Sequence, residues 1–227
     1  MKIRSSLSAA AVVLWTAAAC AQGSYSFTNT VNQAVPDGNP SGLTLAANLT
    51  GMSGPISDIS LSLNIGSASG STAYNGDLYA YLAGPNGGYS VLLNRVGVGT
   101  GNSFGYGDAG MDVTFALGAA SNIHFYQSGI FSLNGAGQLT GTWGADGRTV
   151  DPQSAPAAFD PSGTAGLDSF IGANPNGTWI LFISDLSGGN TPQVNTWTVN
   201  LQTIPEPSAW ALTFLGTLAL IKFRRRS

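Results

Sequence analysis

The chain has 227 residues, of which 8 are basic and 11 acidic, so charged side chains make up 8% of it. Ordinary soluble domains carry about 25%, and the low content argues against a nucleic-acid-binding protein, a coiled coil and a charge-rich disordered chain. The 31 glycines and the total length favour one glycine-rich domain with short appendages.

The charges are unevenly spread along the sequence. Six of the eight basic residues lie near a terminus, and residues 22–204 contain two arginines, ten aspartates, no lysine and no glutamate, a net charge of −8. Lysine and glutamate are common on exposed helix faces, so their absence predicts an acidic, all-β body.

Residues 1–21 have the pattern of a secretory signal peptide. Lys2 and Arg4 precede an apolar stretch that ends in the small residues Ala19 and Ala21. This order predicts an N-terminal signal helix and cleavage after Ala21. A membrane anchor, for which the run is short, and lipidation of Cys20 are the alternatives.

The body alternates apolar and polar residues with the period of β-strands. The alternation covers residues 59–65, 78–82 and 197–201, and clusters of Gly, Asn, Asp and Pro separate the runs. Residues 179–183 are nearly continuous in apolar residues, which predicts a central strand buried on both faces. Residues 135–166 predict a long loop with one short strand near 140–143.

A series of short motifs follows in order along the body. They are Val35-Pro36-Asp37, Ile56–Ile59, Asn75–Leu78, Leu82–Gly87, Leu92–Arg95, Phe170–Gly172, Asn176–Asp185 and Trp197–Leu201. Together they resemble the P domain (P/Homo B domain) that follows the catalytic domain in kexin-like and bacterial subtilisin-type proteases. The resemblance implies an eight-stranded jelly-roll β-sandwich of the galactose-binding-like kind over residues 22–203. One departure is that Thr114-Phe115 precedes Ala116-Leu117-Gly118, where the family often has paired acids.

Residues 204–227 have the pattern of a second targeting segment, after the N-terminal signal peptide. Pro205-Glu206-Pro207 precedes an apolar stretch with Trp210, and Arg224, Arg225 and Arg226 end the chain. This pattern predicts a C-terminal hydrophobic helix with a basic stop-transfer end on the cytoplasmic side. The segment resembles the PEP-CTERM sorting signal, which an exosortase-type membrane transpeptidase recognises in Gram-negative bacteria that make exopolysaccharide. A plain tail anchor is the alternative.

Serine-protease chemistry has little support in the sequence. The subtilisin-type catalytic domain and its motifs are missing, and the sole histidine, His124, lies in a strand-like segment, residues 122–126. One G-x-S-x-G string centres on Ser103, but it lies in a glycine-rich loop without the strand and helix that a nucleophile elbow needs. We therefore expect no catalytic residues, and a serine-peptidase label would be inherited from the family.

Carboxylates offer two further kinds of site. The pairs Asp108 with Asp112 and Asp146 with Asp151 could serve a glycosidase, but nothing distinguishes them from turn aspartates. Calcium prefers oxygen ligands in glycine-rich loops, and the candidate ligands are Asp37, Asp77 and Asp185, which match family positions at loop or strand ends. Asx-turns are the alternative role for the same residues.

Carbohydrate binding is a third possibility for the body. Tyr79 and Tyr81 fall on one face of their strand, where exposed rings could stack on sugars; burial of both faces is the alternative.

The sequence thus predicts a non-catalytic exported protein of the cell surface or extracellular matrix of a Gram-negative bacterium. Before exosortase processing, its C-terminal helix would hold it transiently in the inner membrane, and exopolysaccharide is the expected partner. The alternatives are a calcium- or carbohydrate-binding module and a peptidase-associated domain with no site of its own. No nucleic-acid partner is expected.

Overall fold

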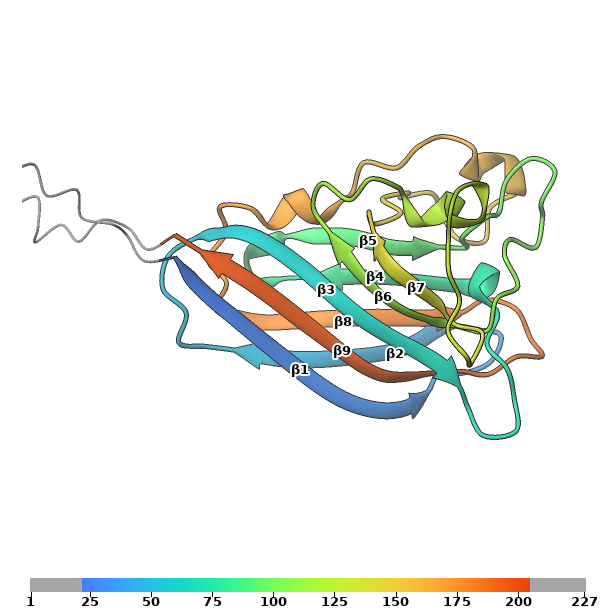
Figure 1. Ribbon diagram of the computed structural model, residues 1–227, viewed down its shortest axis with the longest axis horizontal. Helices are drawn as coiled ribbons and strands as arrows, with labels where there is room; N and C mark the ends of the chain where they lie inside the picture. Colours follow the sequence, from blue (N-terminus) through green and yellow to red (C-terminus); the bar gives the residue numbers. More distant parts are fainter. Residues whose placement is uncertain (1–21, 205–227) are drawn as a thin grey trace, which may run out of the picture. The chain divides into compact units, whose positions relative to one another are not determined.

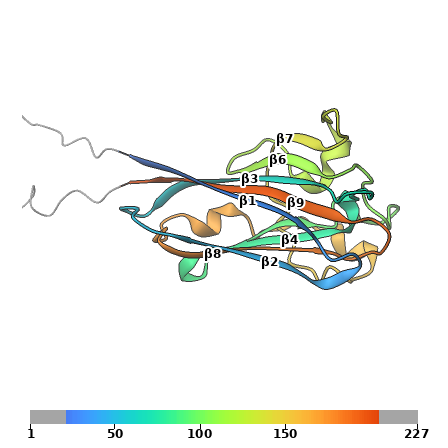
Figure 2. The same cartoon turned by 90° about the horizontal axis from the view of Figure 1, so that it is seen from below.

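Two β-sheets pack face to face in residues 22–204, the part of the chain that the computed structural model describes (Figure 1). One sheet has five strands in the order β1-β9-β3-β6-β7, and the other has four in the order β2-β8-β4-β5. The strands are β1 (Gly23–Ala34), β2 (Asn39–Leu49), β3 (Ile56–Ser67), β4 (Leu78–Ala83), β5 (Tyr89–Asn94), β6 (Met111–Ala116), β7 (Leu139–Trp143), β8 (Gly177–Asp185) and β9 (Pro192–Thr203). The edge-on view in Figure 2 shows the two layers.

Short 3₁₀ helices connect several of these strands. They are η1 (Asn75–Asp77), η2 (Pro85–Gly87), η3 (Ile123–Ser128), η4 (Pro156–Phe159) and η5 (Leu167–Phe170). Residues 22–204 contain no helix that is long and apolar enough to cross a membrane. The expected signal helix and C-terminal helix lie outside the described residues.

The core forms where the inward-facing residues of the two sheets meet. On β3, Ile59, Leu61, Leu63 and Ile65 are buried, as their alternation with polar residues predicted. Leu63 pairs with Val113 on β6 and with Trp197 on β9. This arrangement confirms the all-β prediction at the level of two packed sheets.

A glycine permits an irregularity that shapes β2. The register between β2 and β8 shifts between Asn39 and Leu43, and Gly42 in this interval has φ of +53°. A Cβ on Gly42 would lie 2.3 Å from the Ile183 carbonyl oxygen, so a side chain cannot fit without moving the strands.

Three expectations about strands need correction. The family resemblance implied eight strands, but the described residues form nine, because β7 adds to the sheet edge parallel to β6. Strand β8 is not buried on both faces: Trp179, Leu181 and Ile183 point into the core, while Ile180 and Phe182 stay partly exposed on the outer face. The expected strand around His124 is the 3₁₀ helix η3, which Asn122 caps by accepting a hydrogen bond from the His124 N–H.

Candidate functional site

The three aspartates predicted as calcium ligands lie at one end of the four-stranded sheet. Asp37 precedes β2, Asp77 ends η1 just before β4, and Asp185 is the last residue of β8. Strand pairing brings these ends together, because Asp185 is opposite Asn39 on one side and Leu78 on the other. The Leu186 N–H also donates to the Asp77 carbonyl oxygen at 3.0 Å.

The three carboxyl groups differ in how they are satisfied. Asp37 accepts two hydrogen bonds from the Gly189 N–H, at 3.0 and 3.1 Å. Asp185, which is 1% exposed, accepts one from the Ser187 N–H at 3.1 Å. Asp77 is 8% exposed, and its carboxyl group accepts no hydrogen bond from the residues that the structure describes. A nearly buried carboxylate without a partner is costly.

Burial and mutual repulsion raise two of the pKa values. The pKa of Asp77 rises to about 6, first because of burial and then because of the Asp37 charge, while the Arg95 charge opposes the rise. The pKa of Asp185 also rises to about 6 because burial and the charges of Asp77 and Asp37 outweigh the Ser187 N–H. A cation placed among these groups would relieve both effects.

The cluster is not a preassembled metal cage. Within residues 22–204, no three Asp, Glu, His or Cys side chains lie close enough together to hold a metal ion. Calcium takes six to eight oxygen ligands in flexible geometry, so binding here would require the carboxyl groups to move closer together. The oxygen donors suit calcium, but the carboxyl groups are not arranged as a metal site in this structure.

A second polar cluster is fully enclosed, and the sequence did not reveal it. Asp146 bridges His124 and Arg148: its Oδ2 lies 2.7 Å from His124 Nδ1, and its Oδ1 lies 2.9 Å from Arg148 Nη1. Arg148 Nε also donates to the Phe159 carbonyl oxygen at 2.7 Å. His124 and Asp146 are 0% exposed and Arg148 is 3% exposed.

The surroundings of His124 indicate a structural role. Its Nε2 lies 2.9 Å from the Val98 carbonyl oxygen and its Nδ1 lies 2.7 Å from Asp146 Oδ2, so both ring nitrogens have a hydrogen-bonding neighbour inside the protein. Ser103 is exposed in a bend of the glycine-rich loop, without a strand before it and a helix after it. The His124 ring is fully buried and both of its nitrogens are engaged within the protein, and Ser103 is not in a nucleophile elbow.

The carboxylate pairs considered for a glycosidase have other contacts. Asp108 accepts hydrogen bonds from the Tyr126 hydroxyl at 2.6 Å and from Gln127 at 2.7 Å. Asp151 accepts from the Gln153 N–H at 2.9 Å, which is an Asx-turn. Asp146 is committed to the enclosed cluster, and Asp112 is exposed on β6.

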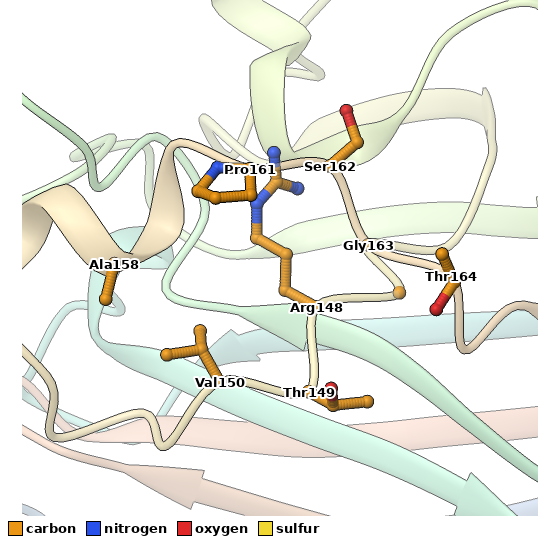
Figure 3. A pocket seen from close by; sticks show the side chains of 9 residues that line it. Arg148, Thr149, Val150, Ala158, Pro161, Ser162, Gly163 and Thr164 are labelled. Carbon is orange, nitrogen blue, oxygen red and sulfur yellow. The ribbon is translucent and has the colours of Figure 1, made fainter.

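A shallow hollow of about 320 Å³ lies beside the enclosed cluster. Figure 3 shows Arg148 reaching toward Pro161 and Ser162, with Thr149 and Val150 on the opposite wall. The walls are held together by the Thr164 and Ala165 N–H groups, which both donate to the Gly147 carbonyl oxygen. Arg148 Nη2 is buried without a partner, but the charges of Asp146 and the nearby Asp160 offset the arginine charge. The pKa of Asp160 is lowered chiefly by hydrogen bonds from Thr100 and slightly by Arg148. The hollow therefore lacks the excess positive charge of an anion site.

The tyrosines considered for sugar stacking lie on the outer face of the four-stranded sheet. The Tyr81 ring stacks on Phe182 with centroids 5.0 Å apart, and the Tyr79 ring meets Phe182 edge-on at 6.2 Å. The Tyr79 hydroxyl lies 3.0 Å from the Tyr89 hydroxyl, and burial raises the pKa of Tyr79. The rings share one face as predicted, and they pack on one another rather than standing free.

The remaining predicted residues cannot be placed. Ala19 and Ala21 of the signal peptide, Pro205, Glu206 and Pro207 of the sorting motif, and Arg224, Arg225 and Arg226 all lie outside the described residues.

Comparisons with known proteins add little. No family model and no curated protein matches this chain. Two solved structures resemble it: a complex of the Aeromonas sobria serine protease with the chaperone ORF2, at 12% identity, and the Aeromonas sobria serine protease, at 11%. Each match covers 81% of this chain and 27% of that chain, with a TM-score of 0.43. At this TM-score the likeness carries no inference.

Proposed function

We propose that this chain is a non-catalytic exported protein of the cell surface or extracellular matrix, sorted by an exosortase-type membrane transpeptidase. The observation that carries the proposal is the order of three segments in the sequence. A signal peptide over residues 1–21 precedes an acidic β-sandwich, and the Pro205-Glu206-Pro207 motif with its apolar stretch and terminal arginines follows.

The arrangement of the first and last strands suits display from a membrane. Gly23 at the start of β1 pairs with Thr203 at the end of β9 (Figure 1). The two ends of the body therefore lie side by side at one end of the five-stranded sheet. A body held through residue 204 would extend away from its attachment point with the opposite end outermost.

The proposed body is a P/Homo B-like jelly roll without its protease. The family-like motifs lie in or beside strands of the sandwich: Asn75–Asp77 forms η1 before β4, residues 177–185 form β8, and Trp197 lies in β9. The burial of His124 and the hydrogen bonds that Asp108, Asp146 and Asp151 make within the fold support a non-catalytic role. The low charge and net negative body suit a hydrated exopolysaccharide matrix.

The intact mass of the protein from the cell envelope and from the culture medium tests this proposal. We expect a chain that begins at Gln22 and ends near the Pro205-Glu206-Pro207 motif. Deleting residues 205–207 should leave the tail in place, whereas Ser208→Ala, just outside the motif, should be processed normally. A full-length tail on the wild-type protein in both fractions would refute exosortase sorting.

Calcium-dependent stability is a second candidate function, and the mutual repulsion of Asp37, Asp77 and Asp185 at one end of the four-stranded sheet favours it. Two buried carboxyl groups with raised pKa values lie at a glycine-rich strand end. A bound cation would stabilise their ionised forms. We expect calcium to raise the melting temperature of the whole chain and a chelator to lower it. Equal melting temperatures in both conditions would exclude the site.

A further inference from the structure

An uncharged stretch of the chain carries a cluster of exposed apolar side chains. Residues 113–145 contain no Asp, Glu, Lys or Arg. Within them, Phe125 is 45% exposed, Ile130 100%, Phe131 37% and Leu133 42%. We call these four side chains the Ile130 patch. Contiguous exposed apolar groups on a folded protein mark an interaction surface.

The Ile130 patch has both a projection and recesses. Ile130 lines two neighbouring hollows of about 280 and 270 Å³, which share Ser121 and Trp143 as well. Phe131 lines the first hollow and Phe125 the second. Each hollow can admit one large apolar side chain, and the fully exposed Ile130 is such a side chain.

Rigid packing supports the patch from below. The Tyr126 ring meets Phe131 at 5.6 Å and Trp143 at 6.2 Å, both edge-on. Tyr126 is fixed by its hydrogen bond to Asp108, and the Arg148 guanidinium lies 4.8 Å from the Phe125 ring centroid. The aromatic side chains around the two hollows are thus packed in place without a partner, which lowers the entropic cost of association.

The patch borders a sheet edge that neighbouring loops cover only in part. β7 is the outermost strand of the five-stranded sheet. The Thr140 N–H is bonded to the Ser132 carbonyl oxygen and the Gly144 N–H to the Ser121 carbonyl oxygen, but Gly141 and Thr142 between them are exposed. Edge strands are commonly shielded by charges or proline, and β7 has neither.

We propose that the partner of the Ile130 patch is a second copy of this chain, in a two-fold dimer. Residues 22–204 carry a net charge of −8, so two copies repel each other wherever their aspartates face. Residues 113–145 add no acidic charge to the surface around the patch, so repulsion between two copies is reduced there, with Asp108 and Asp112 at its border. A projection beside a recess is also self-complementary under a two-fold axis, because each Ile130 can enter the hollow next to its counterpart.

Sedimentation equilibrium of the whole chain in a density-matched neutral detergent tests the proposal. Wild-type protein is expected to be dimeric at micromolar concentration. Ile130→Lys and Ile130→Asp should each weaken the dimer about 30-fold or more, as loss of a central interface residue does. Phe104→Lys is the matched control, because Phe104 is 75% exposed but lies outside the patch.

Mixing the two charged variants gives the sharpest result. Because the two-fold axis brings the two copies of residue 130 close together, Ile130→Lys and Ile130→Asp should form a mixed dimer when combined. A monomeric wild type would overturn the proposal, and so would a dimer that persists in Ile130→Lys, since the latter would place the contact elsewhere, for example in the tail. A monomer whose patch binds a glycan or an unrelated protein would equally overturn it.

Discussion

Replacing Asp77 by asparagine should stabilise the protein without calcium and make it insensitive to calcium. The side chain keeps its size but loses its negative charge, and it is the one member of the aspartate cluster whose carboxyl group has no hydrogen bond among the described residues. The usual expectation for a mutation at a buried polar residue is a loss of stability. The electrostatics of this cluster predict the opposite sign.

The size of the effect follows from the pKa. Burial and the Asp37 charge raise the pKa of Asp77 from 3.8 to about 6, and one pKa unit corresponds to about 1.4 kcal/mol. Ionised Asp77 therefore destabilises the folded chain by about 3 kcal/mol above pH 7. The asparagine amide also lacks a partner, which offsets part of the gain, so we expect a net stabilisation of about 2 kcal/mol. In a domain of this size that is a rise in melting temperature of about 4–8 °C.

Thermal unfolding at pH 8, in chelator and in millimolar calcium, measures the effect. Calcium at about 100 times its dissociation constant should stabilise the wild-type chain by about 2.7 kcal/mol, and Asp77→Asn should lose most of this gain. Asp112→Asn is the matched control, because Asp112 is exposed on β6, and it should behave as wild type. If Asp77→Asn melts at or below the wild-type temperature in chelator, the reasoning about the buried charge is wrong.

Three further predictions concern the pH dependence, the enclosed cluster and the core. The folded-state pKa values of Asp77 and Asp185 are raised to about 6, so their contribution to stability is fully present below about pH 4 and is lost as the pH rises through 6. In chelator, the free energy of unfolding of Asp77→Asn/Asp185→Asn should therefore increase relative to that of the wild type over this pH range. A difference that does not change with pH would contradict the prediction. Asp146→Asn leaves His124 and Arg148 without their carboxylate and should lower the free energy of unfolding, measured in urea, by about 3–5 kcal/mol. Asp151→Asn, in an exposed turn, should lower it little. Equal losses in the two variants would show that the enclosed cluster does not stabilise the fold more than an exposed turn does. Leu63→Ala should lower the free energy of unfolding by about 2–5 kcal/mol, because it creates a cavity between the sheets. Ser62→Ala, on the opposite face of β3, should lower it by about 1 kcal/mol or less. Similar losses in the two variants would contradict the assignment of the two faces.

The sequence predicted best where a local pattern decides the outcome. The alternation over residues 59–65 placed four side chains in the core correctly, since in a strand the period of two determines the face. The family-like motifs placed Asp37, Asp77 and Asp185 at strand or loop ends, and pairing of β8 with β2 and β4 puts these ends on one side of the sheet, but the three carboxyl groups do not form a metal-binding group. The short strand expected near residues 140–143 is β7.

Features that depend on contacts between distant segments were not predictable. The enclosed cluster requires η3 and the loop after β7 to meet, and no local pattern marks Asp146 as the partner of His124. Residues 122–126 contain alternating apolar side chains that suit a strand, yet the Asn122 cap and the packing of Tyr126 beneath Phe131 favour a 3₁₀ turn. Similarly, the sequence gives no sign that Ile130 is exposed, because an isoleucine is usually part of a core.

The pairing of Gly23 with Thr203 has a mechanical consequence. A force that pulls the two ends of the body apart acts across the antiparallel β1–β9 ladder from its open end. The hydrogen bonds of this ladder would then break one pair at a time, starting at Gly23, rather than sharing the load. A force applied between residue 204 and the Ile130 patch would instead run through the sheet, so resistance to stretching should depend on where the protein is held.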